Sequence, residues 1–131
     1  MLDSKTFFHL IDPTKNIIVA FSGGGDSTAL LNYCYELKQD NHLKGSLSAI
    51  HVNHSISPHA DLWAMHCKNF CSERDIPLVC ESIKVDGKKS GLESAARQGR
   101  YEVFKQNISS SDQLLLAHPA DDVAENLMFR L

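Results

Sequence analysis

Several features that would point to particular protein classes are missing from the sequence. No apolar run is long enough to cross a membrane, and the N-terminus lacks the basic region and apolar stretch of a secretion signal. The four cysteines form no tight framework, which favours reduced thiols in the cytoplasm over a disulfide-bonded secreted domain. With a formal net charge of −3, the chain also lacks the positive excess typical of nucleic-acid binders. We therefore expect one cytoplasmic domain of 131 residues, large enough for a hydrophobic core.

The most informative stretch is a glycine-rich turn between an expected strand and an expected helix. The strand, 16–21, is apolar and rich in β-branched residues, three consecutive glycines occupy 23–25, and the helix is expected from Thr28 to about Gln39. Glycine lets the backbone turn sharply and come close to a ligand. Ser22 or Ser27 can cap the helix, and the first N–H groups of a helix form an anion site. The stretch therefore predicts a phosphate-binding turn.

Two familiar phosphate-binding loops do not fit this turn. A Walker A loop requires a lysine that is absent here, and the dinucleotide fingerprint requires a glycine where Thr28 stands. The remaining motif, Ser-Gly-Gly-Gly-Asp-Ser, resembles the PP-loop of ATP pyrophosphatases, which cleave ATP to AMP and pyrophosphate. Asp26 is the candidate ligand for a Mg²⁺ ion that bridges the phosphates. Backbone N–H groups of the turn and the hydroxyls of its Ser and Thr residues are the candidate pyrophosphate ligands. The residues concerned are Ser22, Gly23, Gly24, Gly25, Asp26, Ser27 and Thr28. An ordinary glycine-rich turn is the structural alternative.

Strands and helices are expected to alternate along the chain. Further strands are expected at 47–52, 77–83 and 113–118, and further helices at 2–10, from Ser57-Pro58 to about 75, at 92–106 and from about Asp121. This alternation predicts an α/β, Rossmann-like parallel sheet with helices on both faces. Each expected strand is followed by polar residues, at 22–27, 51–54, 84–91 and 118–125. Because ligands bind at the carboxyl ends of parallel strands, we predict one composite site there.

The polar residues after the second strand allow two interpretations. His51, Asn53 and His54 can bind the adenine or the ribose of a nucleotide. Alternatively, the two histidines could join Cys67 and Cys71 in a metal site, since these cysteines lie one helical turn apart. Buried cysteines are commonly small hydrophobic residues, and we expect Cys67 and Cys71 to lie on one side of their helix with Trp63 and Phe70.

Charged groups gather at two further places. The segment 84–100 carries a local excess of positive charge, a candidate patch for polyanions, in which Arg97 and Arg100 lie three residues apart on one helix. A solvated helix face and a charged loop would explain the same residues. Asp122 and Glu125 have the spacing of a capping box, which is a structural role. They could also receive an ammonium group or a metal ion.

Taken together, the motifs resemble the N-terminal domain of bacterial tRNA(Ile)-lysidine synthetases along nearly the whole chain. The matching pieces are the glycine-rich turn through 31, Ala49-Ile50-His51-Val52-Asn53-His54, the segment 91–101, and Asp121-Asp122-x-x-Glu125. The resemblance implies that ATP adenylates the first anticodon cytidine of an isoleucine tRNA with a CAU anticodon, and that L-lysine then displaces AMP. It implies that the turn binds pyrophosphate and that Asp26 assists catalysis through Mg²⁺. Residues 51–54 would line the nucleotide site. Arg97 and Arg100 would stabilise phosphates or tRNA, and Asp122 and Glu125 would receive the lysine.

The sequence departs from this family at the last expected helix. Pro119 replaces the family's histidine, with His118 one position earlier as a candidate substitute, and Val123 and Asn126 replace a glutamine and a threonine. No stop signal precedes Leu131, so we expect the PP-loop domain, residues 1–131, to be incomplete at its C-terminal end. Basic tRNA-binding domains beyond it would explain the acidic net charge. The alternatives are another PP-loop enzyme, such as a tRNA thiolase or an amide-forming synthetase, and a nucleotide-binding fragment without catalysis.

Overall fold

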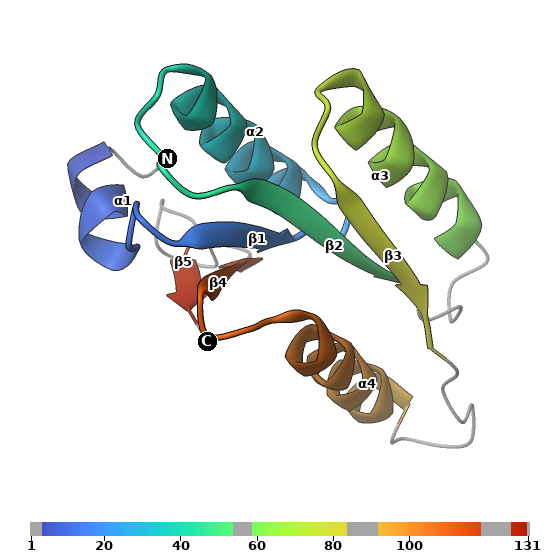
Figure 1. Ribbon diagram of the computed structural model, residues 1–131. Helices are drawn as coiled ribbons and strands as arrows, with labels where there is room; N and C mark the ends of the chain where they lie inside the picture. Colours follow the sequence, from blue (N-terminus) through green and yellow to red (C-terminus); the bar gives the residue numbers. More distant parts are fainter. Residues whose placement is uncertain (1–3, 54–58, 84–91, 119–126, 131) are drawn as a thin grey trace.

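The computed structural model describes residues 4–53, 59–83, 92–118 and 127–130 (Figure 1). Its helices are α1 (Ser4–Leu10), α2 (Gly25–Gln39), α3 (Ala60–Glu73) and α4 (Leu92–Asn107). Its strands are β1 (Asn16–Ala20), β2 (Leu47–Asn53), β3 (Leu78–Ser82), β4 (Asp112–His118) and β5 (Leu127–Arg130). Within these ranges no helix has the length and apolar content needed to cross a bilayer.

The strands form one sheet in the order β3-β2-β1-β4-β5. The first four are mutually parallel, and at the carboxyl end of β1, Ala20 pairs with Ile50 of β2 and with Leu116 of β4. Figure 1 shows α2 and α3 on one face of the sheet and α4 on the other. The expected α/β sheet with helices on both faces is therefore confirmed, and the four parallel carboxyl ends meet at one edge.

A separate hydrophobic core lies on each face of the sheet. Alternating strand residues serve the two faces, so that Val19 and Ala49 point to one core and Ile18 and Ile50 to the other. On the α2/α3 face, α2 contributes the stripe that its periodicity predicts, Leu30, Leu31, Cys34 and Leu37. On the α4 face, the buried residues are Ile50, Val52, Val103, Phe104 and Leu114. Both faces of β1 and β2 are thus covered, and ligands have access at the strand ends.

Two helices begin at different residues from those expected. The helix after the glycine turn, α2, begins at Gly25 rather than Thr28, with Gly24 as its N-cap and no side-chain capping bond. Neither candidate serine is therefore the N-cap. The next helix, α3, begins at Ala60 with His59 as N-cap, and the Ser57-Pro58 pair lies outside the described residues. Among the described residues, neither N-cap residue makes a side-chain capping hydrogen bond.

One side of α3 is buried, although not every residue expected there. Cys67 and Cys71 are buried, together with Ala60 and Ala64, and Phe70 packs against this core. Trp63, expected on the same side of the helix as these residues, is 48% exposed. It lies at the margin of the stripe, where the small residues Ala60 and Ala64 bring the helix close to the sheet instead.

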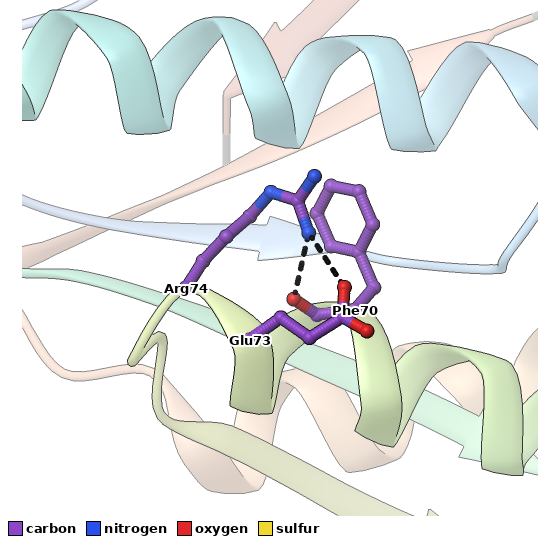
Figure 2. A network of polar contacts seen from close by, with 3 residues as sticks. All are labelled: Phe70, Glu73 and Arg74. Atoms are coloured by element: carbon purple, nitrogen blue, oxygen red, sulfur yellow. Dashed lines mark hydrogen bonds and ion pairs between the residues drawn. The ribbon is translucent and has the colours of Figure 1, made fainter.

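The C-terminal end of α3 is held by the residue that caps it, Arg74. Figure 2 shows its guanidinium group donating to the Phe70 carbonyl, with Nη1 3.1 Å from the oxygen, and approaching the Glu73 carboxylate. The guanidinium carbon also lies 3.7 Å from the centroid of the Phe70 ring. A cation at a helix C-terminus is favourable because the free carbonyls there carry partial negative charge. The same ring contacts Phe21, at 5.3 Å between centroids, so this cap supports the residue that precedes the glycine turn.

The segment expected as the end of a last helix is a strand. Residues 127–130 form β5, which pairs antiparallel with β4, for example Phe129 with Leu116. Leu127, Met128 and Phe129 make a short apolar run, and periodicity cannot distinguish a helix from a strand in such a run. Pairing with the free edge of β4 satisfies its backbone groups and decides the outcome. The expected helix start at Asp121 lies outside the described residues.

Candidate functional site

The glycine turn between β1 and α2 is closed by its own serine hydroxyls. The Ser22 N–H donates to Ser27 Oγ at 3.1 Å, the two hydroxyl oxygens lie 2.9 Å apart, and the Gly24 N–H donates to Ser22 Oγ. The hydroxyls of Ser27 and Thr28 both donate to the Gly24 carbonyl. These side chains therefore shape the loop from within. That they also bind pyrophosphate directly stays a prediction.

Only the first of the three glycines is required by the conformation of the loop. Gly23 has φ +95°, and a Cβ atom there would lie 3.2 Å from Cys67 Sγ on α3. A side chain would thus be strained in two ways, by its backbone angle and by the packed helix. At Gly25, in contrast, a Cβ atom would meet no atom of the described residues within 4 Å. As far as these residues are concerned, the space in front of Gly25 is open.

The open space faces the N-terminus of α2. The first N–H group that is bonded within the helix is that of Thr28, which donates to the Gly24 carbonyl at 3.0 Å, so the helix leaves the N–H groups of Gly25, Asp26 and Ser27 unpaired. Together with the helix dipole they offer donors and partial positive charge to an anion. The loop thus provides what a pyrophosphate group needs, chiefly from its backbone.

Asp26 stands in this first turn and itself supplies one of the three N–H donors. It is partly exposed, and within the described part of the chain its carboxylate makes no hydrogen bond or ion pair. Mg²⁺ in nucleotide sites is usually held by one or two carboxylates together with phosphate oxygens. A free carboxylate beside phosphate-binding amides therefore fits Mg²⁺.

His51 and Asn53, at the carboxyl end of β2, are buried and bonded to neighbouring elements. The His51 Nδ1 atom lies 2.8 Å from the Phe21 carbonyl, which can only accept, so this nitrogen carries the proton. The Asn53 amide donates to Asp61 in the first turn of α3 at 3.1 Å. Asp61 is not among the site residues expected from the sequence. No local sequence pattern predicts it, because its contact with Asn53 forms only when β2 and α3 are adjacent.

Arg100 lies on the opposite face of the sheet, which α4 covers (Figure 1). It belongs to α4, which enters from the carboxyl end of β3 and packs on β2 and β4 through Val103 and Phe104. Its Nε atom is buried and has no hydrogen-bond partner among the described residues. Next to it, a Cβ on Gly99 would lie 2.6 Å from Ile83 Cδ1, so glycine lets α4 pack closely. Arg97 lies one turn earlier on this helix.

The two cysteines considered as metal ligands, Cys67 and Cys71, are placed as core residues. Cys67 Sγ lies 3.5 Å from His51 Nδ1, but within the described ranges no group of three or more possible metal ligands occurs. Burial raises the pKa of Cys67 to about 12 and that of Cys71 to about 11. Both thiols therefore keep their protons near neutral pH and pack as small hydrophobic groups.

Of the remaining candidates, His118 alone belongs to the part of the chain that the structure describes. His54, Asp122 and Glu125 lie outside the described residues. His118 is the last residue of β4, at the carboxyl edge that also carries the glycine turn. The structure therefore brings together the loop, the end of β2 and the end of β4.

Comparisons with known proteins agree with this geometry. A model of the PP-loop domain matches residues 3–131. The tRNA(Ile)-lysidine synthases of Haemophilus influenzae strain PittEE and Escherichia coli O157:H7 are 40% and 39% identical, over 89% and 90% of this chain. That of Yersinia pseudotuberculosis is 35% identical over 95% of the chain. The chain spans only 27%, 27% and 28% of the length of these relatives. A match over nearly the entire chain, on a loop of this geometry, shows that the chain belongs to the PP-loop domain family.

Proposed function

We propose that this chain is the ATP-binding part of an enzyme that joins lysine to the first anticodon cytidine of an isoleucine tRNA with a CAU anticodon. The observation that carries the proposal is the N-terminus of α2, where three backbone N–H groups and the Asp26 carboxylate adjoin space that no described residue fills. Support for this particular tRNA and product comes from the relatives, which are named tRNA(Ile)-lysidine synthases. The localisation that fits such a substrate is the cytoplasm.

The proposed reaction has two steps. The cytosine oxygen at position two attacks the α-phosphorus of ATP, and pyrophosphate leaves with the electrons of the broken P–O bond. The lysine amine then attacks the activated ring carbon, loses a proton and expels AMP. Mg²⁺, when bound, would neutralise charge on the departing phosphates.

Residues of this chain would chiefly hold and orient the triphosphate. The N–H groups of Gly25, Asp26 and Ser27 donate to the β- and γ-phosphate oxygens, so they stabilise the charge that develops as pyrophosphate leaves. Asp26 would hold Mg²⁺, which would supply positive charge to the phosphates. Arg100, whose Nε has no partner among the described residues, is the cation for the α-phosphate or the tRNA backbone, with Arg97 beside it. His118, Asp122 and Glu125 stay the candidates for the lysine pocket.

Two measurements test this function in sequence. The chain should bind MgATP, and Asp26→Asn should weaken binding about tenfold at limiting Mg²⁺ while leaving Mg²⁺-free binding unchanged. The full-length protein should then release pyrophosphate only with unmodified isoleucine tRNA of CAU anticodon, and should incorporate lysine. Release with another tRNA or another nucleophile would favour a different PP-loop enzyme. If the chain binds ATP but the full-length protein releases no pyrophosphate, the result would indicate a nucleotide-binding fragment without catalysis.

A further inference from the structure

The carbonyl of Phe21 is held by a side chain at the point where β1 ends. The last backbone bond between β1 and β2 runs from the Phe21 N–H to the Ile50 carbonyl, at 2.8 Å. The next acceptor, the Phe21 carbonyl, receives its hydrogen bond from the ring of His51, also at 2.8 Å. The imidazole thus continues the ladder by one bond, in the residue that leads directly into the glycine turn.

The same imidazole contacts the helix that packs on the turn. Cys67 Sγ lies 3.5 Å from His51 Nδ1 and 3.8 Å from the Phe21 oxygen. This sulfur is also the nearest atom to the Cβ position of Gly23. The backbone from 21 to 23 is therefore fixed between β2 and α3, and its orientation sets that of the N–H groups beyond it.

The burial of His51 argues against a direct contact with a ligand in this conformation. Its exposed fraction is 4%, and it lies beneath the loop, on the α3 face of the sheet. Its proton is on Nδ1, because a carbonyl oxygen can only accept. A ligand could reach the ring only if the groups that bury it moved.

We propose that His51 is a positioning residue of the PP-loop: its Nδ1–H group fixes the Phe21 carbonyl and thereby the phosphate-binding N–H groups, and it does not contact the nucleotide. The inference rests on the proposed function, since it assigns His51 a role in binding the phosphates of ATP. It replaces the expectation that His51 lines the adenine or ribose.

Three substitutions distinguish the role of the hydrogen-bond donor at Nδ1 from the role of the rest of the imidazole ring. His51→Asn places an amide nitrogen near the Nδ1 position, His51→Gln places it near Nε2, and His51→Leu removes it. If the Phe21 bond is what matters, Asn should restore function and Gln should not. If the ring contacts the ligand through Nε2, the order is reversed.

The test measures the affinities of the chain for MgATP, magnesium pyrophosphate and AMP by calorimetry. His51→Leu and His51→Gln should weaken ATP and pyrophosphate by the same factor, about five- to tenfold for one buried hydrogen bond, with AMP less affected. His51→Asn should stay within about twofold of the natural chain. Loss of ATP and AMP binding with unchanged pyrophosphate binding would overturn the proposal.

Two controls keep the outcome decisive. Leu37→Ala, at the far end of α2, removes a buried side chain and should lower stability without changing pyrophosphate affinity in the folded protein. In the ligand-free chain, the amide resonances of 23–27 should shift in His51→Leu and return in His51→Asn. Unshifted resonances would refute the positioning role, whereas a natural chain that binds neither ATP nor pyrophosphate would refute the proposed function alone.

Discussion

The two edges of the parallel sheet are built from the same strands and differ in how they use their polar groups. At the amino edge, Asn16 donates to Asp112 and accepts from the Ser46 N–H, each at 3.0 Å. Gln113, 1% exposed, bonds both the N–H and the carbonyl of Asp12. At the carboxyl edge, the helix leaves the first N–H groups of α2 unpaired, and on α4 Arg100 Nε has no hydrogen-bond partner among the described residues. One edge satisfies its polar groups internally and contributes stability, whereas the other keeps donors for a ligand.

The largest effect on stability is expected at the amino edge, from Gly45→Ala. A Cβ atom at Gly45 would overlap the backbone of Lys15 and Asn16, which cannot move without disturbing β1. We expect a loss of about 3 kcal/mol in the free energy of unfolding. Urea denaturation measures it, and the protein that remains folded should bind ATP normally. Weakened ATP binding in the folded fraction would mean that the two edges are coupled.

At the carboxyl edge, two neighbouring glycines should behave differently. Gly23→Ala imposes a left-handed backbone angle and a contact with Cys67, so we expect about 2 kcal/mol of destabilisation together with lost pyrophosphate binding. Gly25→Ala fills open space at a helix start, so stability should change by less than about 0.5 kcal/mol. Its methyl group would nevertheless crowd a bound phosphate. Unaltered pyrophosphate affinity in Gly25→Ala would place the ligand elsewhere.

Arg100→Met should affect function and leave stability nearly unchanged. The substitution keeps an apolar stem while it removes a buried N–H group without a partner among the described residues, so unfolding should shift by less than about 1 kcal/mol, towards greater stability. Pyrophosphate release by the full-length protein should fall. The matched control is Lys105→Met, which removes an exposed cation from the same helix. Equal loss in both variants would point to general electrostatics.

The smallest effect is expected from Asp112→Asn and depends on pH. Hydrogen bonds from the Ser109 N–H, the Asn16 amide and the Ser109 hydroxyl hold the pKa of Asp112 below its ordinary value of 3.8. Its contribution to stability is therefore present above that value and is lost as the pH falls through the lowered pKa. The natural chain should be slightly more stable than the variant near neutral pH, and the difference should vanish in acid. A constant difference in urea unfolding across this range would contradict the assignment.

Much of this arrangement follows from local sequence. The β-branched run at 16–21, the glycine turn and the order of strands and helices predict the sheet and its ligand-binding edge. The contacts that complete the site do not follow, because they join residues far apart in the chain. His51 meets Phe21 only once β1 and β2 are paired, and Gly23 meets Cys67 only once α3 is packed. Strand β5 was missed for a similar reason: its partner, β4, decided its structure.

The placement of the four cysteines offers a direct way to follow the opening of one layer. Cys34, Cys67 and Cys71 are buried between the sheet and α2 or α3, whereas Cys80 is exposed on β3. In the native protein, an alkylating reagent should modify Cys80 alone. Any further modification would record a transient separation of α2 or α3 from the sheet, and its rate would give the frequency of that event. Slower modification with bound ATP would show that the ligand locks the layer that supports the loop.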